Sequence, residues 1–395
     1  MSREGTSMSR EGTSMSREPR AGCWVPWLSC LLAGAGAGAG RFQGRGCRAY
    51  PVGGARVPPC APVTPGGILP ARDTVMSPGD PPTPLELRSR PYGGDADAAR
   101  ILRFLQDGWR VTGTAGGLFH IADFVWQCFM FTRDVFRPEE RIRLTERPDG
   151  SLAGFAWVYP KRGEVALQID PRLRGTAERW VIADDMLAWA RERLLASGEA
   201  PPGGLLVAEL ESDAEFATFA AERGFARTDD VPMRFHRRSL SEPIPAPSLP
   251  AGLTVRPVMG EDEFEQRVAI HREVWHPSRF TIDGYRQLRA TPWYDPDLDL
   301  VAVTPDGTFA AYATAWRDEV NRSGQFEPVG AREAFRGRGL ARAVLLEGMR
   351  RLRDRRCDVA YVCTGEDRPP ACRLYLSAGF EIADRWVYYR RGGGS

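Results

Sequence analysis

The sequence predicts an α+β protein in which one domain is repeated in tandem, and three observations support this prediction. Short strand-like runs lead into amphipathic helical patterns at corresponding places in two parts of the chain. Pro-Asp-Gly turns at residues 148–150 and 305–307 lie between strand-like runs and are typical of β-hairpins. A proline-rich segment, residues 242–250, separates the two parts and can form neither a helix nor a central strand.

Four landmarks recur in the same order in both copies. They are a strand feeding a helix, the hairpin turn, an Arg-Gly pair before a helix, and a Gly-Phe pair. Coincidence among common α/β patterns explains any single match, but four in one order favour repetition. Besides the turns, the matched pairs are 85–88 with 253–256, 95–105 with 262–274, Arg174-Gly175 with Arg336-Gly337, and Gly224-Phe225 with Gly379-Phe380. We therefore expect a first domain at residues 84–238, a linker at 239–251 and a second domain at 252–391.

Residues 1–75 differ in composition from the rest of the chain. The heptapeptide 1–7 repeats as 8–14 and starts again at Met15, and an Ala-Gly run and Pro/Gly-rich sequence follow. A signal peptide is one interpretation, but Pro26 and Ser29 interrupt its apolar run. We favour a low-complexity extension from a start codon assigned too far upstream, with Met76 as a plausible beginning.

The overall composition describes a globular protein. The chain has 43% hydrophobic and 26% charged residues with a net charge of +2, and Lys161 is its sole lysine, which argues against a polybasic surface for nucleic acid or membrane. None of the eight cysteines shows Cys-x-x-Cys spacing, so we expect no metal site and no redox pair. Reduced thiols and a cytoplasmic location are the default expectation.

The most informative segment is a glycine loop between a strand and a helix. An apolar strand at 326–331 leads into Arg336-Gly337-Arg338-Gly339, and 341–352 has the apolar spacing of an amphipathic helix. Glycines at such a turn let backbone N–H groups converge at a helix N-terminus, where the dipole favours an anion. With the positive charge of both arginines, this pattern predicts a pyrophosphate site.

Two other glycine loops do not fit. A Walker loop would end in Gly-Lys-Ser/Thr, which is absent from the sequence. A dinucleotide fingerprint would need a third glycine and an acidic residue at the end of the next strand, which here is the apolar run 358–363.

The second copy resembles the GNAT-type, acetyl-CoA-dependent N-acetyltransferases. Their Gln/Arg-x-x-Gly-x-Gly/Ala signature is matched by Arg336, Gly339 and Ala341, and their closing Leu-Tyr-x-x-x-Gly-Phe segment by residues 374–380. The resemblance implies two GNAT-like domains, each a mixed, largely antiparallel sheet flanked by helices. It also implies acetyl-CoA as co-substrate and transfer to an amine by direct attack in a ternary complex.

The resemblance assigns roles to particular residues. Glu327 would act as the base that removes a proton from the amine, and Tyr375 as the acid that protonates the leaving thiolate. The alternatives are that Glu327 pairs with an arginine on a strand face and that Tyr375 only packs. Arg368 stands where the family commonly has an Asn. The cofactor would be bound by Val329, Gly330, Ala331, Arg336, Gly337, Arg338, Gly339, Leu340, Ala341 and Arg342.

The first copy departs from the same pattern. Ala177 replaces the second glycine of the loop, Glu178 adds a carboxylate in the first helical turn, and Ala220 stands at the position of the tyrosine. We expect this copy not to bind acetyl-CoA productively and to serve packing or the acceptor site.

Several other residues allow two interpretations. His271 and His276 are expected to be surface or packing residues because no partner lies at ligand spacing. The acidic loop 295–297 could steer a cationic acceptor, although a solvated turn explains it better. Four aromatic residues could line an acceptor pocket or fill the core: Trp275, Trp293, Tyr294 and Trp316.

The function favoured by the sequence is acetyl transfer from acetyl-CoA to a primary amine on a small molecule. The alternatives are transfer to a protein or peptide N-terminus, use of another acyl-CoA, and a non-catalytic acyl-CoA-binding module. The presence of both Glu327 and Tyr375 favours an enzyme. A small-molecule amine is the expected partner, with neither nucleic acid nor membrane involved.

Overall fold

The computed structural model describes residues 86–113, 117–199 and 203–392. The extension expected at 1–75 lies outside these ranges. The described residues belong to one compact unit, which we divide for description into a first half, 86–240, and a second half, 241–392.

Each half alternates strands and helices in the order that the sequence predicts. The strands of the first half are β1 (Arg88–Pro91), β2 (Ile142–Glu146), β3 (Leu152–Tyr159), β4 (Glu164–Ile169), β5 (Leu205–Leu210), β6 (Ala226–Arg227) and β7 (Met233–Ser239). Its helices are α2 (Asp95–Thr112), α3 (Ile121–Phe129), α4 (Pro138–Arg141), α5 (Ala177–Ser197) and α6 (Ala214–Glu222).

The second half repeats this arrangement. Its strands are β8 (Thr254–Pro257), β9 (Asp299–Val303), β10 (Phe309–Asp318), β11 (Ser323–Ala331), β12 (Val359–Gly365) and β13 (Glu381–Arg391). Its helices are α7 (Phe264–Val274), α8 (Ile282–Arg289), α9 (Leu340–Asp354) and α10 (Pro369–Ser377). The turns 148–150 and 305–307 connect β2 to β3 and β9 to β10 as expected.

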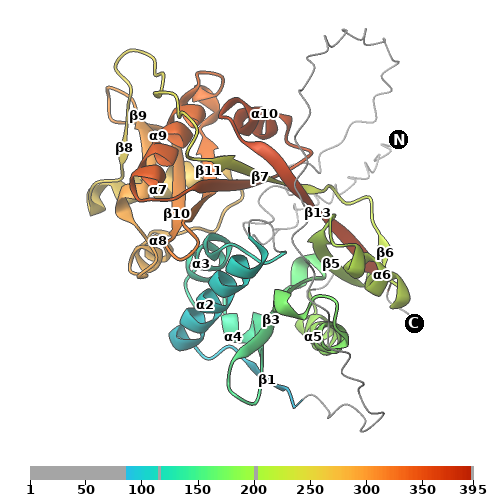
Figure 1. Cartoon of the computed structure of the whole chain (residues 1–395). Coiled ribbons are helices and arrows are strands. Elements are labelled where there is room, and N and C mark those ends of the chain that lie inside the picture. The colour runs from blue at the N-terminus through green and yellow to red at the C-terminus, as the bar shows by residue number, and fades with distance from the viewer. Residues whose placement is uncertain (1–85, 114–116, 200–202, 393–395) are drawn as a thin grey trace, which may run out of the picture. The chain divides into compact units, whose positions relative to one another are not determined.

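The strands of both halves form one mixed sheet (Figure 1). Across the described ranges its order is β1-β2-β3-β4-β5-β13-β7-β12-β11-β10-β9-β8, with β6 beside β13. Its neighbours are antiparallel except in the described pairs β4/β5 and β11/β12. The predicted fold class, a mixed and largely antiparallel sheet flanked by helices, is confirmed.

The two halves exchange their last strands, which the sequence did not predict. β13 of the second half lies between β5 and β7, and β7 of the first half lies between β13 and β12. Figure 1 shows both strands crossing the middle of the molecule. Each half is therefore completed by a strand of the other, and the domain boundaries proposed from the sequence stay a prediction.

The helices pack their apolar faces on the apolar residues of the sheet. α9 buries Leu340, Val344 and Leu345 against the second half of the sheet. Gly348 permits a close approach, because a Cβ there would lie 2.5 Å from the Phe326 ring. α3 packs on β10 and β11 from the first half, so the core is continuous between the halves.

Strand β11 separates from β12 halfway along its length. Their parallel pairing runs from Ser323 opposite Val359 to Gln325 opposite Tyr361 and ends there. On its other side β11 carries two residues, Glu327 and Pro328, between positions where β10 carries Thr314 alone. Such a bulge bends a strand and redirects its side chains, and here it opens the sheet at Glu327.

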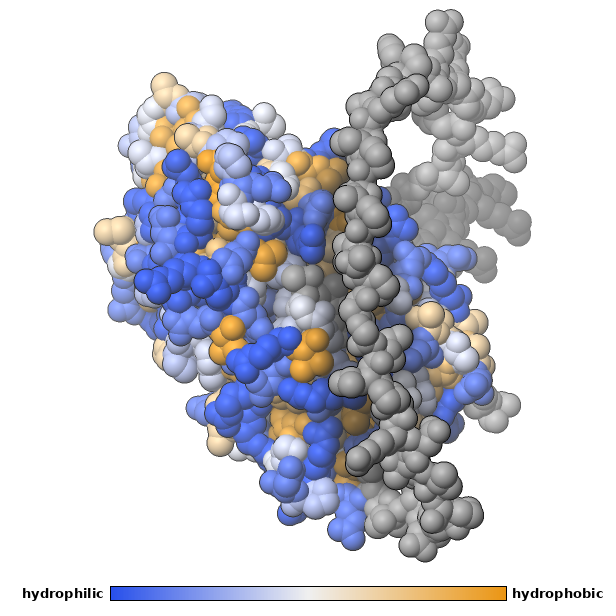
Figure 2. Space-filling view, in the orientation of Figure 1, coloured by the Kyte–Doolittle hydropathy of each residue, from blue (hydrophilic) through white to orange (hydrophobic). Residues whose placement is uncertain are grey.

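None of the helices in the described ranges is both long enough and apolar enough to cross a lipid bilayer. Figure 2 shows one face, on which hydrophilic residues predominate and apolar residues are scattered.

Candidate active site

A cavity of about 420 Å³ opens where β11 and β12 separate. Its walls come from β11, the glycine loop, α9, β12 and α10 of the second half, the end of α7, and two residues of the first half. The residues expected from the sequence that line it are Glu327, Val329, Gly330, Ala331, Arg336, Gly337, Gly339, Leu340, Ala341, Arg342 and Tyr375. Arg338 lies outside this wall, with its guanidinium 5.4 Å from the centre of the Phe335 ring.

The glycine loop has the geometry that an anion site needs. Gly337 and Gly339 have φ values of 76° and 77°, in the left-handed region that glycine favours. Gly339 caps α9, and the N–H groups of the first helical turn lie at the positive end of the helix dipole. No acidic residue in that turn offsets this positive potential. Arg336 and Arg342 on the wall add positive charge.

Glu327 lies at the bulge of β11 and faces the cavity. Its backbone carbonyl accepts a hydrogen bond of 2.6 Å from Trp316 Nε1, which holds the strand at this point. Burial of the carboxyl, with a smaller contribution from the charge of Asp123, raises the pKa of Glu327 well above its ordinary value. A carboxyl with a raised pKa in a cavity is typical of a group that exchanges protons during a reaction.

Asp123 is a second carboxylate of the cavity, and it comes from the first half. Its Oδ1 accepts a hydrogen bond of 2.6 Å from Gln325 Nε2, and its Oδ2 accepts one of 3.0 Å from the His120 backbone N–H. The side chain is 4% exposed and lines the cavity with Glu327. Sequence reasoning missed this residue because its only local signal is a His-x-x-Asp capping box at the start of α3.

His120 joins the halves next to the same site. Its Nδ1 accepts a hydrogen bond from the Ala122 N–H, so Nε2 carries the proton and donates to Ser323 Oγ at 3.1 Å. Burial lowers the pKa of His120 to about 4. The N-terminus of α3 thus contacts β11 at residues 323 and 325, immediately before the bulge.

Tyr375 forms the opposite wall on α10. It is buried, and its ring packs edge-on against Phe380 at 6.1 Å and His236 at 5.5 Å between ring centres. The proposed base and acid therefore belong to different walls of one cavity, and the structure brings both to it.

Trp275 and Arg368 meet on the cavity wall. The Trp275 Nε1–H donates a hydrogen bond of 2.7 Å to the Tyr312 hydroxyl, and the Arg368 guanidinium lies 5.4 Å from the centre of the Trp275 ring. Trp275 is the member of the four candidate aromatic residues that lines the cavity. Trp293 packs on Phe129 instead, and Tyr294 donates a hydrogen bond to Asp299.

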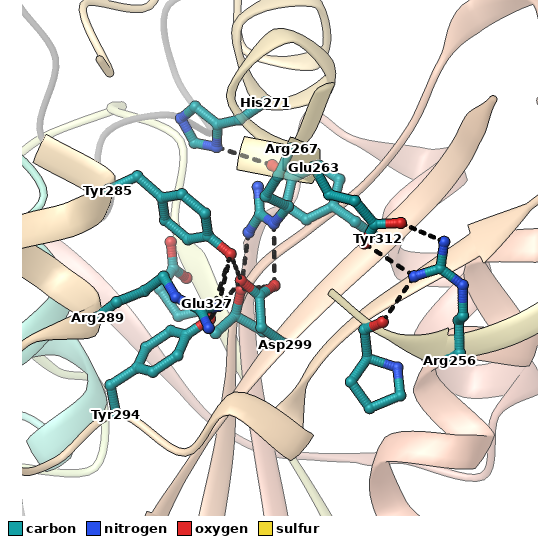
Figure 3. A network of polar contacts seen from close by, with 12 residues as sticks. Arg256, Glu263, Arg267, His271, Tyr285, Arg289, Tyr294, Asp299, Tyr312 and Glu327 are labelled. Atoms are coloured by element: carbon teal, nitrogen blue, oxygen red, sulfur yellow. Dashed lines mark hydrogen bonds and ion pairs between the residues drawn. The ribbon is translucent and has the colours of Figure 1, made fainter. Parts of the chain in front are cut away.

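A buried polar network supports the bulge from behind (Figure 3). Arg267 Nε contacts Asp299 Oδ1 at 2.9 Å, and Arg267 Nη2 donates to Thr314 Oγ1 at 2.9 Å. The Tyr285 and Tyr294 hydroxyls both donate to Asp299 Oδ2. Because Thr314 lies opposite the bulge, this network fixes the strand against which Glu327 is positioned.

The two candidate histidines and the acidic loop do not line the cavity. His271 is buried and packs on Trp126 at 5.4 Å, whereas His276 is exposed. Asp295 and Asp297 both pair with Arg355, the residue that caps the C-terminal end of α9. Cys128, Cys357, Cys363 and Cys372 form no disulfide within the described ranges, and the described residues contain no cluster of metal ligands. Cys23, Cys30, Cys47 and Cys60 lie outside the described ranges.

The corresponding place in the first half is closed by the protein's own charges. The Gly175 N–H donates to Glu215 Oε2 at 3.1 Å, and Arg179 pairs with Asp213 at 2.6 Å and with Glu215 at 3.2 Å. The cavity there measures about 20 Å³. Carboxylates of α6 and its cap thus occupy the donors that a pyrophosphate would need.

Comparison with known proteins gives consistent relatives. The acetyltransferase (GNAT) family model matches residues 264–380. The chain is 33% identical over 264 residues to a mycothiol acetyltransferase of Kineococcus radiotolerans. The aligned region covers 63% of this chain and 81% of that protein. A mycothiol acetyltransferase of Thermobispora bispora is 30% identical over 255 residues, 61% of this chain and 80% of that protein.

Two solved structures share the fold. A GCN5-related N-acetyltransferase from Sphaerobacter thermophilus gives a TM-score of 0.53 at 23% identity and covers 77% of this chain and 95% of its own. A tandem GNAT protein from the clavulanic acid biosynthesis pathway gives 0.55 at 17% identity and covers 78% and 99%.

Proposed function

Because the chain belongs to the acetyltransferase (GNAT) family and is an acyltransferase by that membership, we propose that it transfers the acetyl group of acetyl-CoA to a primary amine of a small molecule. The transfer takes place by direct attack in a ternary complex. The observation that carries this proposal is the single cavity that joins the glycine loop, Glu327 and Tyr375.

Acetyl-CoA would extend along the opening between β11 and β12. The glycine loop and the N-terminus of α9 would bind its pyrophosphate, with Arg336 and Arg342 adjoining. The pairing between β11 and β12 ends before Val329, Gly330 and Ala331. The backbone of these three residues would pair with the pantetheine amides as an added strand does.

The acceptor reacts as a neutral amine, so its ammonium form must first lose a proton. Glu327 would take this proton, and its raised pKa makes it a stronger base than an ordinary carboxylate. The amine nitrogen then bonds to the acetyl carbon, the carbon–sulfur bond breaks, and the sulfur receives the proton of the Tyr375 hydroxyl. The nitrogen, which carries one proton too many after the attack, releases it, and the Tyr375 phenolate takes up a proton in turn, so that the phenol is restored. The products are the N-acetylated amine and free CoA.

The two carboxyl groups indicate the charge of the acceptor. Asp123 and Glu327 line the same cavity, and a cationic ammonium group would be attracted to both before deprotonation. The mycothiol acetyltransferases among the relatives support a small-molecule acceptor.

The test is a screen of purified protein with acetyl-CoA and a panel of primary amines, with free-thiol release as readout. Matched secondary amines and alcohols serve as controls, and propionyl-CoA and short peptides test the alternative donor and acceptor. We expect thiol release that requires a primary amine and yields the acetylated product. Acetyl-CoA binding without thiol release from any amine would instead favour a non-catalytic binding module.

A further inference from the structure

The helix that carries Tyr375 rests on a strand of the other half. β7, the last strand of the first half, pairs with β12 from Ser239 opposite Val359 to Met233 opposite Gly365. Alternate residues of a strand face the same side, and three alternate residues of β7 contact α10 or its flanking loops. α10 packs on α9 and β12 of its own half, and β7 of the first half adds a further surface against it.

The outer two of these contacts hold the ends of α10. Arg234 Nε donates to Glu366 Oε1 at 2.9 Å, in the loop that precedes the helix. Arg238 Nη1 donates to the carbonyl of Ala378, which caps the end of the helix. These contacts fix where α10 begins and ends above the strand.

His236 is the central contact. Its ring is fully buried, and its centre lies 5.5 Å from that of Tyr375 at an interplanar angle of 62°. Neither ring nitrogen makes a hydrogen bond of good geometry among the residues that the structure describes, although the backbones of Arg234 and Val362 lie close enough to influence the pKa of the ring. The contact between His236 and Tyr375 is therefore one of ring packing, in the edge-to-face arrangement that aromatic rings prefer.

We propose that His236 is a positioning residue for Tyr375: the first half supplies the imidazole ring that holds the phenol in its reactive orientation in the second half. The proposal rests on the proposed function in taking Tyr375 as the proton donor to the thiolate. Between His236 on one side and Phe380 on another, the tyrosine ring has little freedom to turn.

A buried imidazole without hydrogen bonds of good geometry is a costly way to fill space. Burial lowers the pKa of His236 to about 4, so the ring is neutral at physiological pH and places no charge beside the phenol. Its effect must come from its shape. Removal of the ring would leave a gap beside Tyr375, and small displacements of a reacting group reduce rates strongly.

This role would give the first half a function in the reaction. The place in that half that corresponds to the cofactor cavity measures about 20 Å³, yet β7 contacts the proposed acid of the other half. Loss of the first half would remove the contacts that Arg234, His236 and Arg238 make with α10 and its flanking loops.

The experiment compares variants of the full chain with His236→Ala, His236→Phe and the control Arg237→Ala. Arg237 is adjacent on β7, but it is exposed and pairs with Glu381. We expect His236→Ala to lower kcat by about tenfold or more with the KM for acetyl-CoA unchanged. Phe, which keeps a packing ring, should restore most of the rate, and Arg237→Ala should match the unaltered chain.

The Tyr375→Phe background separates positioning from a general loss of fold. If His236 acts through the Tyr375 hydroxyl, His236→Ala should cause no further loss there. A loss that multiplies with that of Tyr375→Phe, or equal losses for Ala and Phe, would overturn the proposal. If His236→Ala fails to fold, His236→Leu keeps the bulk without the ring and is expected to show the same loss of kcat.

A readout independent of turnover distinguishes failure of this proposal from failure of the proposed function. In protein labelled with fluorotyrosine, the Tyr375 ¹⁹F resonance is identified by its absence in Tyr375→Phe. We expect it to shift or broaden in His236→Ala and to keep its position in His236→Phe. An unchanged resonance in His236→Ala would overturn the positioning role even if the enzyme transfers acetyl groups.

Discussion

At the scale of single residues, the cavity contains two carboxyl groups that come from different halves of the chain. Glu327 could be predicted because it precedes a recognisable loop on its own strand. Asp123 could not, because it lies about two hundred residues away in the chain, as its hydrogen bond to Gln325 shows, and only the packing of α3 on β11 brings it to the cavity. Sequence patterns report local geometry, and this pair is a product of tertiary packing.

The first prediction concerns Asp123→Asn. The charge of Asp123 contributes to the raised pKa of Glu327, so its removal should lower that pKa and move the acidic limb of kcat/KM to lower pH. Asn keeps one of the two accepting oxygens, which can still accept the hydrogen bond from the His120 backbone N–H, while its NH2 group replaces the oxygen that accepts from Gln325. The pH profile of kcat/KM is the measurement, with the exposed hairpin variant Asp149→Asn as control. An unchanged acidic limb would mean that Asp123 does not influence the base.

The second prediction concerns Tyr375→Phe. If the hydroxyl protonates the thiolate, kcat should fall by about a hundredfold or more, while acetyl-CoA affinity changes little because the ring still packs on His236 and Phe380. Steady-state kinetics together with calorimetry of acetyl-CoA binding measure both quantities. Full activity would reduce Tyr375 to a packing residue and leave another group as the proton source.

At the scale of elements, the glycine loop was predictable and the opposing wall was not. The loop could be predicted because its residues are consecutive in the sequence, and its glycines with positive φ lie between a strand and a helix. The strand exchange leaves no such trace, because β7 and β13 look like ordinary terminal strands until their partners are known. Sequence reasoning therefore recognised the repeat but assigned each copy its own complete sheet.

The third prediction concerns this loop and its counterpart. Gly339→Glu should abolish acetyl-CoA binding, because it places a side chain and a negative charge at a left-handed position in the anion site. Ala177→Glu in the first half should leave binding nearly intact, since the carboxylates of Asp213 and Glu215 already fill that place. Titration calorimetry should give one site per chain in the unaltered protein. Two equivalent sites would contradict the assignment of a closed first half.

At the scale of the whole molecule, the histidines couple folding to pH. His120, His236 and His271 are buried, and burial lowers the pKa of each: to about 4 for the first two and well below the ordinary value for His271. All three lie near contacts between the halves, against Ser323, Tyr375 and Trp126 respectively. Protonation of these rings therefore opposes the packing that unites the molecule.

The fourth prediction is a loss of stability in mild acid. A histidine whose pKa is depressed in the folded state is protonated more readily in the unfolded chain, so its contribution is fully present above pH 6.5 and is lost as pH falls from 6.5 towards 4. A shift from 6.5 to about 4 corresponds to about 3 kcal/mol for each ring at the end of that range. Urea unfolding at pH 7, 6 and 5 should show the free energy of unfolding falling at each step.

Two variants serve as controls for this loss of stability. The free energy of unfolding of His236→Phe should fall less over this pH interval than that of the unaltered chain, because Phe cannot take up a proton. The free energy of unfolding of His276→Phe should fall as much as that of the unaltered chain, because His276 is exposed. Equal slopes in all three proteins would show that groups other than the buried histidine of β7 set the acid response.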